Sequence, residues 1–128
     1  MITSVVVDGA DINYDPTKWD YTQTSIELTD ASNVVINILG DNASTAKQNT
    51  WQIWIDLNDD GIFEGQSEEL IVSTSVAQGQ PYGFSVALDL SALENNGEAK
   101  YMRIYGDTYP YQSCYVAVGE ALDLRVTW

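Results

Sequence analysis

The clearest two-residue period of the chain is in Gly83-Phe84-Ser85-Val86-Ala87-Leu88-Asp89-Leu90. Successive side chains of a β-strand point to opposite faces, so the large apolar residues of this run share one face and Ser85, Ala87 and Asp89 share the other. The C-terminal run Ala121–Trp128 repeats the pattern, with Leu122, Leu124, Val126 and Trp128 on one side. Both runs are therefore predicted to be strands that bury one face.

Similar short runs continue toward the N-terminus and between these two segments. They are rich in Val, Ile, Thr, Tyr and Trp, and the linkers between them carry Gly, Asn, Asp, Ser and Pro. The further predicted strands are Ser4–Val7, Thr24–Leu28, Asn33–Leu39, Thr50–Asp56, Glu69–Thr74, Ala99–Tyr105 and Ser113–Val118. About nine short strands with almost no helical period predict an all-β fold, an antiparallel β-sandwich of jelly-roll type, with a closed barrel as the alternative.

Length and charge restrict the organisation and the partners. The 128 residues suffice for one domain over 1–128, and 45% apolar residues can form a core. Nineteen acidic residues against five basic ones give a net charge of −14, which repels nucleic acid and anionic membrane surfaces. No apolar run approaches the roughly 20 residues of a membrane-spanning helix. We therefore expect a monomer with neither nucleic acid nor membrane as a partner.

The residues that the chain lacks exclude several kinds of catalysis. It has no His, so Ser-His-Asp triads, Cys-His pairs and imidazole-bound zinc are excluded. Cys114 is the only cysteine, so the chain forms no internal disulfide. Its apolar neighbours favour a small buried side chain over a reactive thiol. Carboxylates are the only catalytic groups present in quantity.

An acidic loop follows the predicted strand Thr50–Asp56. Oxygen-bearing side chains stand at its first, third and fifth positions (Asp56, Asn58, Asp60), and Gly61 stands at the sixth. This spacing is that of the first half of an EF-hand calcium loop, in which alternate side chains converge and Gly permits a sharp turn. The carbonyl group of Ile62 is then the expected ligand at position seven. The spacing predicts a calcium site.

The second half of this loop departs from the EF-hand. Position twelve is Ser67, and the acidic residues Glu68 and Glu69 follow it. We therefore expect Glu68 to complete the calcium ligands, in a loop preceded by a strand instead of a helix. The alternative is a solvated acidic turn, because Asp, Asn and Gly are common in any turn.

The run from Ile53 to Phe63, together with Glu68, resembles the centre of GEVED domains, which are accessory modules of secreted, multidomain bacterial proteins. These domains are named for a Gly-Glu-Val-Glu-Asp signature, which here reads Gly119-Glu120-Ala121-Leu122-Asp123. The strand Tyr101–Ile104 and Cys114 also resemble features of this family. The resemblance implies a β-sandwich with a cation at the Asp-rich loop. It also implies that Glu120 is a second acidic group close to that loop, although an ordinary strand-edge residue is an alternative.

A Tyr-rich segment, Tyr105-Gly106-Asp107-Thr108-Tyr109-Pro110-Tyr111-Gln112, is the candidate ligand-binding loop. Aromatic rings stack on the C–H faces of sugar rings, and carboxylates and amides bind sugar hydroxyls. This combination resembles carbohydrate-binding modules, and it predicts ligand contacts by Tyr105, Asp107, Tyr109, Tyr111 and Gln112. Trp19, in the aromatic segment Tyr14–Tyr21, is a further candidate. The alternative is that these Tyr residues serve only in sheet and turn packing.

Three functions follow from these features. The first is a non-catalytic, calcium-binding accessory module that binds polysaccharide and belongs to a larger secreted or surface protein of a bacterium. The second is a structural or adhesive spacer domain that calcium makes rigid. The third is a small glycoside hydrolase with an Asp/Glu pair, which needs a deep cleft between two carboxylates. A 128-residue sandwich rarely has such a cleft, so we expect no enzymatic activity.

Overall fold

The computed structural model describes residues 2–15, 17–40, 49–61, 70–76, 83–93, 97–107 and 120–128. These residues form nine strands and no helix. The strands are β1 (Ile2–Val7), β2 (Ala10–Asp11), β3 (Asp20–Glu27), β4 (Val34–Gly40), β5 (Asn49–Ile55), β6 (Leu70–Val76), β7 (Gly83–Leu88), β8 (Lys100–Asp107) and β9 (Glu120–Thr127). No helix in this part of the chain has the length and apolar character needed to cross a membrane.

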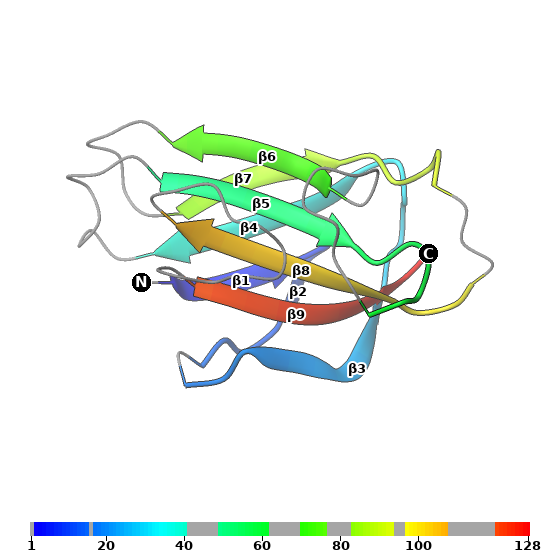
Figure 1. Cartoon of the computed structure of the whole chain (residues 1–128), viewed down its shortest axis with the longest axis horizontal. Coiled ribbons are helices and arrows are strands. Elements are labelled where there is room, and N and C mark those ends of the chain that lie inside the picture. Colours follow the sequence, from blue (N-terminus) through cyan, green and yellow to red (C-terminus); the bar gives the residue numbers. More distant parts are fainter. Residues whose placement is uncertain are drawn as a thin grey trace.

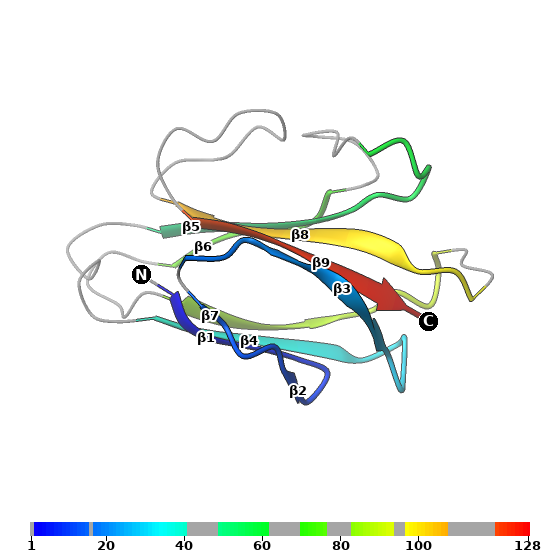
Figure 2. The same ribbon diagram turned by 90° about the horizontal axis from the view of Figure 1, so that it is seen from below.

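Two sheets lie face to face (Figures 1 and 2). The first has four strands in the order β2-β1-β4-β7, and the second has five strands in the order β3-β9-β8-β5-β6. The chain changes sheets repeatedly, so strands distant in the sequence become neighbours. The β-sandwich predicted from the alternating pattern is confirmed.

The core fills the space between the sheets, because each strand directs alternate apolar side chains inward. The four-stranded sheet contributes Val5, Val7, Val34, Ile36, Ile38 and Leu88, and the five-stranded sheet contributes Trp51, Ile53, Ile55, Met102, Ile104, Leu122, Leu124 and Val126. Ser85, Ala87 and Asp89 are exposed, as the alternation in β7 predicts. The main core therefore lies between the inner faces of the two sheets.

The observed topology differs from the predicted one in two details. Strand β3 pairs in parallel with β9, with a register shift between Tyr21 and Ser25, so the sandwich is mixed and not wholly antiparallel. The jelly-roll connection is not confirmed, because β1 pairs with β4 and not with a C-terminal strand. The order β9-β8-β5-β6 instead follows the G-F-C-C′ order of an immunoglobulin-type sheet. The predicted strand Ser113–Val118 lies outside the described residues.

Candidate metal centre and sheet-face site

The acidic loop begins where β5 ends. The backbone N–H of Asp56 donates to the carbonyl oxygen of Tyr101 at 3.0 Å, which extends the β5–β8 ladder by one residue. The chain then leaves the sheet. Asp59 has φ 56° and Gly61 has φ 76°, a left-handed conformation that Gly adopts without strain. These two positions curl the chain back toward Asp56.

Hydrogen bonds connect Asp56, Asn58 and Asp60 within this loop. The Asp56 carboxylate is only 1% exposed and accepts the N–H groups of Gly61 at 2.8 Å and Asp60 at 3.3 Å. Asn58 Oδ1 accepts the Asp60 N–H at 3.3 Å, and Asn58 Nδ2 donates to Asp60 Oδ2 at 3.2 Å. All three predicted side chains are therefore brought together.

Lys100 binds two residues of the same loop, Leu57 and Asp59. Lys100, which is largely buried, donates from Nζ to Asp59 Oδ2 at 2.7 Å and to the Leu57 carbonyl oxygen at 3.3 Å. Asp59 is thus turned away from the other acids and neutralised. Asp56 and Asp60 are the two carboxylate residues that share hydrogen bonds with each other or with Asn58 in this loop.

The described part of the loop fits a calcium ion in its chemistry. Every converging side chain offers oxygen, which is the ligand type calcium prefers, and the flexible geometry of calcium tolerates a loop of this kind. Among the described residues, no group of three or more His, Cys, Asp or Glu side chains is arranged to hold a metal. The loop provides two carboxylates and one amide instead. The other predicted ligands, Ile62 and Glu68, lie outside the described residues.

The strand register places Glu120 away from Asp56, and the part of the loop that contains Glu68 lies outside the described residues. The register pairs Glu120 with Gly106 and Gly106 with Trp51, so Glu120 stands across from the start of β5. Asp56 follows the end of β5, five positions further along (51 to 56), or roughly 17 Å at about 3.3 Å per residue. Figure 1 shows the start of β9 and the end of β5 at opposite ends of the sheet. Strand direction separates these two acids.

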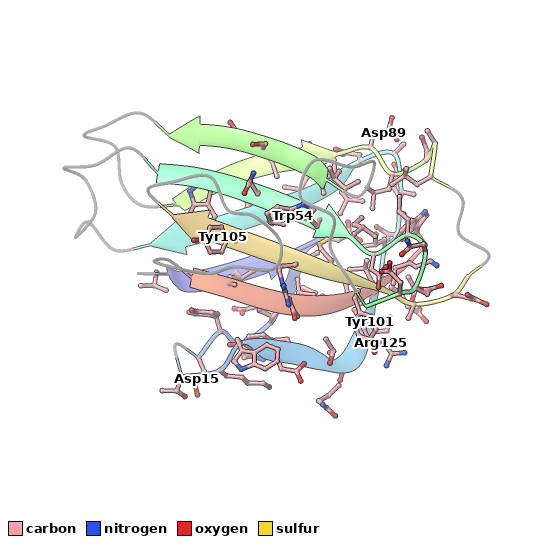
Figure 3. The ribbon with its side chains drawn as sticks, in the orientation of Figure 1. Asp15, Trp54, Asp89, Tyr101, Tyr105 and Arg125 are labelled. Atoms are coloured by element: carbon pink, nitrogen blue, oxygen red, sulfur yellow. The ribbon has the colours of Figure 1, made fainter. Side chains whose placement is uncertain are left out.

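A second apolar cluster lies on the outer face of the five-stranded sheet. Trp54 and Tyr105 point away from the main core, pack together with Ala121, and are 0% and 1% exposed. Figure 3 shows them on the adjacent strands β5 and β8. A buried ring offers no face to a sugar, so Tyr105 is a packing residue, which corrects its predicted role as a ligand contact.

The other predicted ligand contacts have mixed positions. Asp107 is the last residue of β8, opposite Thr50. Tyr109, Tyr111 and Gln112 lie outside the described residues. Trp19 is 62% exposed and is the one member of the predicted set that presents a described aromatic side chain to solvent.

Sequence reasoning missed an ion pair beside Trp19. Arg103 Nε donates to Asp123 Oδ1 at 2.7 Å, and Arg103 Nη2 donates to Asp123 Oδ2 at 2.9 Å, so the pair is bidentate. These residues are direct cross-strand neighbours in β8 and β9. Trp19, Arg103, Ala121 and Asp123 line a pocket of about 230 Å³. Opposite charges at outward positions of two predicted strands were the available signal, but the register was needed to pair them.

The family comparison covers the residues that form the loop, the ion pair and the signature strand. The GEVED domain family matches residues 50–127, which is more than half of the chain. The chain belongs to the GEVED domain family. Neither the curated proteins nor the solved structures gave a match. Within this GEVED domain, the signature residue Asp123 binds Arg103, and the matched region leaves out Trp19 and strands β1 to β4.

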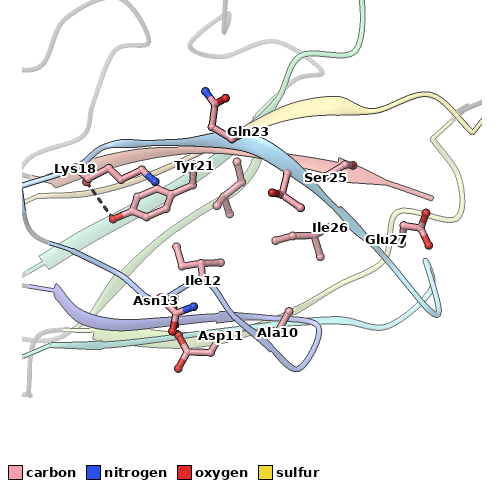
Figure 4. A pocket seen from close by; sticks show the side chains of 12 residues that line it. Ala10, Asp11, Ile12, Asn13, Lys18, Tyr21, Gln23, Ser25, Ile26 and Glu27 are labelled. Carbon is pink, nitrogen blue, oxygen red and sulfur yellow. Dashed lines mark hydrogen bonds between the residues drawn. The ribbon is translucent and has the colours of Figure 1, made fainter.

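A larger pocket of about 640 Å³ opens in the GEVED domain between the β2 segment and β3 (Figure 4). Tyr21, Ile26 and Leu124 contribute apolar surface to it, and Asn13, Gln23 and Glu27 contribute polar groups. Tyr21 stacks on Tyr14 with ring centroids 6.1 Å apart, and its hydroxyl accepts the Asp15 N–H at 2.9 Å. Lys18 Nζ lies 4.6 Å from the centre of the Tyr21 ring. These contacts make Tyr21 a fixed wall of the pocket.

Four aspartates of the domain share one local motif, Asp-x-Ser or Asp-x-Thr, at Asp15, Asp20, Asp30 and Asp89. In the Asp89 turn, the Ser91 hydroxyl donates to Asp89 Oδ1 at 2.5 Å and the Ser91 N–H donates at 2.9 Å. These hydrogen bonds lower the pKa of Asp89 below its ordinary 3.8. The equivalent Ser or Thr lowers the pKa of the other three carboxyl groups. The hydrogen bonds of this motif therefore favour the ionised form of the four carboxyl groups.

Proposed function

We propose that this GEVED domain is a non-catalytic, calcium-binding accessory module of a secreted bacterial protein and that it binds polysaccharide. The observation that carries the calcium proposal is the hydrogen-bonded turn that joins Asp56, Asn58 and Asp60. A carboxylate as buried as that of Asp56 needs compensation, and its two N–H donors provide only part of what a cation provides. Calcium supplies this charge, and Ile62 and Glu68 are the further proposed ligands.

Calcium has a structural task in this proposal. Asp56 follows β5, Tyr101 belongs to β8, and Lys100 contacts Leu57 and Asp59 of the loop from the start of β8. A cation held by Asp56, Asn58 and Asp60 fixes the chain that leaves β5 against the edge of the sheet. The proposed role is therefore to order this end of the sandwich, and no reaction step passes through the ion.

The polysaccharide part of the proposal depends on aromatic and polar surface. Trp19 is exposed next to the charged pair of Arg103 and Asp123, which provides one aromatic face and fixed hydrogen-bonding groups. Tyr109, Tyr111 and Gln112 remain proposed contacts from the sequence. The net charge of −14 favours a neutral polysaccharide, because an anionic one would be repelled.

Calcium binding is tested by titrating the metal-free domain with calcium and, separately, with magnesium. We expect one calcium per chain and much weaker magnesium binding, because magnesium requires strict octahedral geometry. Asp60→Ala should abolish most of the heat of calcium binding, whereas Asp59→Asn should retain it, since Asp59 faces Lys100. Equal loss in both variants would show that general loop charge, and not the converging set, attracts the ion.

A spacer domain is the second candidate function, and the Lys100 contacts favour it. Lys100 joins the start of β8 to Asp59 and Leu57, so the loop is already tied to the sheet and calcium would stiffen it further. Screening immobilised neutral polysaccharides distinguishes the two candidates. Calcium binding without retention on any polysaccharide supports the spacer, and calcium-dependent retention supports the polysaccharide-binding module.

A further inference from the structure

The position of Trp19 combines a fixed backbone with an exposed ring. Its carbonyl oxygen accepts the N–H of Asp123 at 2.8 Å, and β3 begins at the next residue. The side chain is nevertheless 62% exposed, whereas Trp51 and Trp54 are completely buried and Trp128 is partly buried. A large aromatic ring left in water on an anchored segment is a ready binding surface, because little conformational freedom is lost when a ligand stacks on it.

The floor of the neighbouring pocket carries fixed polar groups. Arg103 and Asp123 hold each other in a two-bond fork, and their side chains are 24% and 13% exposed. Each oxygen of Asp123 accepts one hydrogen bond from Arg103 and can accept another. Ala121 has a small side chain, and the pocket of about 230 Å³ forms between these residues and Trp19.

The chemistry of this pocket specifies its ligand. A Trp ring attracts the weakly positive C–H face of a pyranose, and the Asp123 carboxylate accepts hydrogen bonds from sugar hydroxyls. The Arg103–Asp123 pair has no net charge, and the chain carries −14, so an anionic sugar gains nothing here. The volume is below the roughly 300–1,000 Å³ of pockets for drug-sized ligands, which suits one sugar ring of a longer chain.

We propose that Trp19, Arg103, Ala121 and Asp123 form a binding subsite for one neutral pyranose ring of a polysaccharide. Trp19 stacks on the ring, Asp123 accepts its hydroxyls, and Arg103 holds the Asp123 carboxylate in place. This inference rests on the proposed polysaccharide function and assigns it to the outer face of the five-stranded sheet. It differs from a site in the Tyr109–Gln112 segment or in the larger pocket beside β3.

The test uses the whole chain with calcium present and four neutral hexasaccharides as probes, built from β-1,4-glucose, β-1,4-mannose, β-1,4-xylose or β-1,3-glucose. Affinity is measured by calorimetry, and acrylamide quenching of Trp fluorescence measures access to Trp19. Trp51 and Trp54 are fully buried and Trp128 is partly buried, so quenching reports chiefly on Trp19. Bound sugar should reduce the acrylamide quenching of Trp19 fluorescence.

Trp19→Ala should weaken binding about tenfold or more, the usual cost of truncating a central aromatic contact. Trp19→Phe should retain part of the affinity, since a smaller ring remains, and Asp123→Asn should weaken it through loss of the charged acceptor. Tyr101→Ala and Gln23→Ala are matched controls. Tyr101 is an exposed aromatic residue of the same sheet outside the pocket, and Gln23 lines the larger pocket. Both should bind as the original chain does.

The outcomes separate the subsite from the general function. Binding that survives Trp19→Ala and Asp123→Asn in folded protein overturns the subsite and leaves polysaccharide binding standing. If only Gln23→Ala loses affinity, the site lies in the larger pocket, and the proposed subsite is overturned. If the original chain binds none of the four probes, the subsite as proposed fails, and retention of the chain on other neutral polysaccharides decides whether the wider function fails with it. Thermal melting of each variant, Trp19→Ala and Asp123→Asn included, verifies that it is folded.

Discussion

The ring of Trp51 lies directly on the backbone of Gly106. These residues are cross-strand neighbours in β5 and β8, and a Cβ atom added to Gly106 would come within 2.6 Å of Trp51 Cε3 and closer still to Cζ3. Heavy atoms do not approach so closely without displacement. The absence of a side chain at Gly106 therefore leaves space for the Trp51 ring, the largest side chain of the main core.

Gly106→Ala should destabilise the domain by about 1–3 kcal/mol, the usual cost of overpacking a core. Gly106 is not among the glycines with positive φ, so the expected loss comes from the clash with Trp51 and not from backbone strain. Denaturant unfolding measures the change. Trp51→Phe in the same chain should relieve part of it, so that the double variant loses less than the two single losses added together. Strict additivity would contradict the proposed contact.

Removal of calcium should lower the melting temperature. Without calcium, the negative charges of Asp56 and Asp60 repel each other within one short loop. Calcium at a hundredfold excess over its dissociation constant adds about 2.7 kcal/mol. Melting curves with calcium and with chelator measure the difference. Asp60→Ala should remove most of the response, and Asp89→Ala, an acid in a turn on the other sheet, should keep it. Identical curves with and without chelator, for protein first shown to bind calcium, would refute a stabilising role.

Breaking the Arg103–Asp123 pair should cost more stability than a typical exposed ion pair. Arg103→Ala leaves the poorly exposed Asp123 carboxylate without two charge-assisted hydrogen bonds, so we expect a loss of about 1–3 kcal/mol. Arg103→Lys should be intermediate, because an ammonium group cannot form the same fork. Urea unfolding of both variants gives these values. A loss near zero for Arg103→Ala would place the pair among ordinary surface ion pairs.

The Asp-x-Ser and Asp-x-Thr turns should lose their stabilising effect in acid. The pKa of each carboxyl group is lower in the folded chain than its ordinary 3.8, so the folded state favours the ionised form. That contribution is complete above pH about 4 and disappears as the pH falls through the lowered folded pKa. Carboxyl titration by NMR, with chelator present, should show the Asp89 pKa rising toward 3.8 in Ser91→Ala. An unchanged titration would assign the shift to another cause.

The domain should release no reducing sugar from the neutral polysaccharides that it is proposed to bind. The chain has no His, and its converging carboxylates, Asp56 and Asp60, are proposed to hold calcium. The assay is reducing-end release over a long incubation with the purified chain. Turnover that disappears when one Asp or Glu is changed to its amide would show that the domain is a glycosidase after all.

The sequence predicted most of the strands and the turn that joins Asp56, Asn58 and Asp60, because both depend on near neighbours in the chain. Alternation in Gly83–Leu90 places Leu88 and Leu90 in the core and Ser85, Ala87 and Asp89 outside. The spacing of Asp56, Asn58 and Asp60 places them in one hydrogen-bonded turn of five residues. Strand β2 was missed, since two residues carry no usable period.

Strand β5 does not alternate between a buried and an exposed face. Trp51, Gln52, Ile53 and Trp54 are all buried, because β5 lies inside its sheet and carries an apolar cluster on its outer face as well. Tyr105, predicted to contact ligand because it begins the Tyr-rich segment, is buried in the same outer cluster. A local pattern does not reveal that a sheet has two covered faces.

By itself, the sequence determined an acidic all-β domain with an Asp-rich loop, because composition, two-residue periods and loop spacing are properties of consecutive residues. Tertiary structure alone decided which strands are neighbours. The register of β8 and β9 joined Arg103 to Asp123, the parallel pairing of β3 brought Trp19 beside them, and the direction of β9 separated Glu120 from Asp56. Such pairings depend on backbone hydrogen bonds between segments up to about a hundred residues apart, and every backbone N–H is chemically alike. Only the packing of the complete sandwich selects among them.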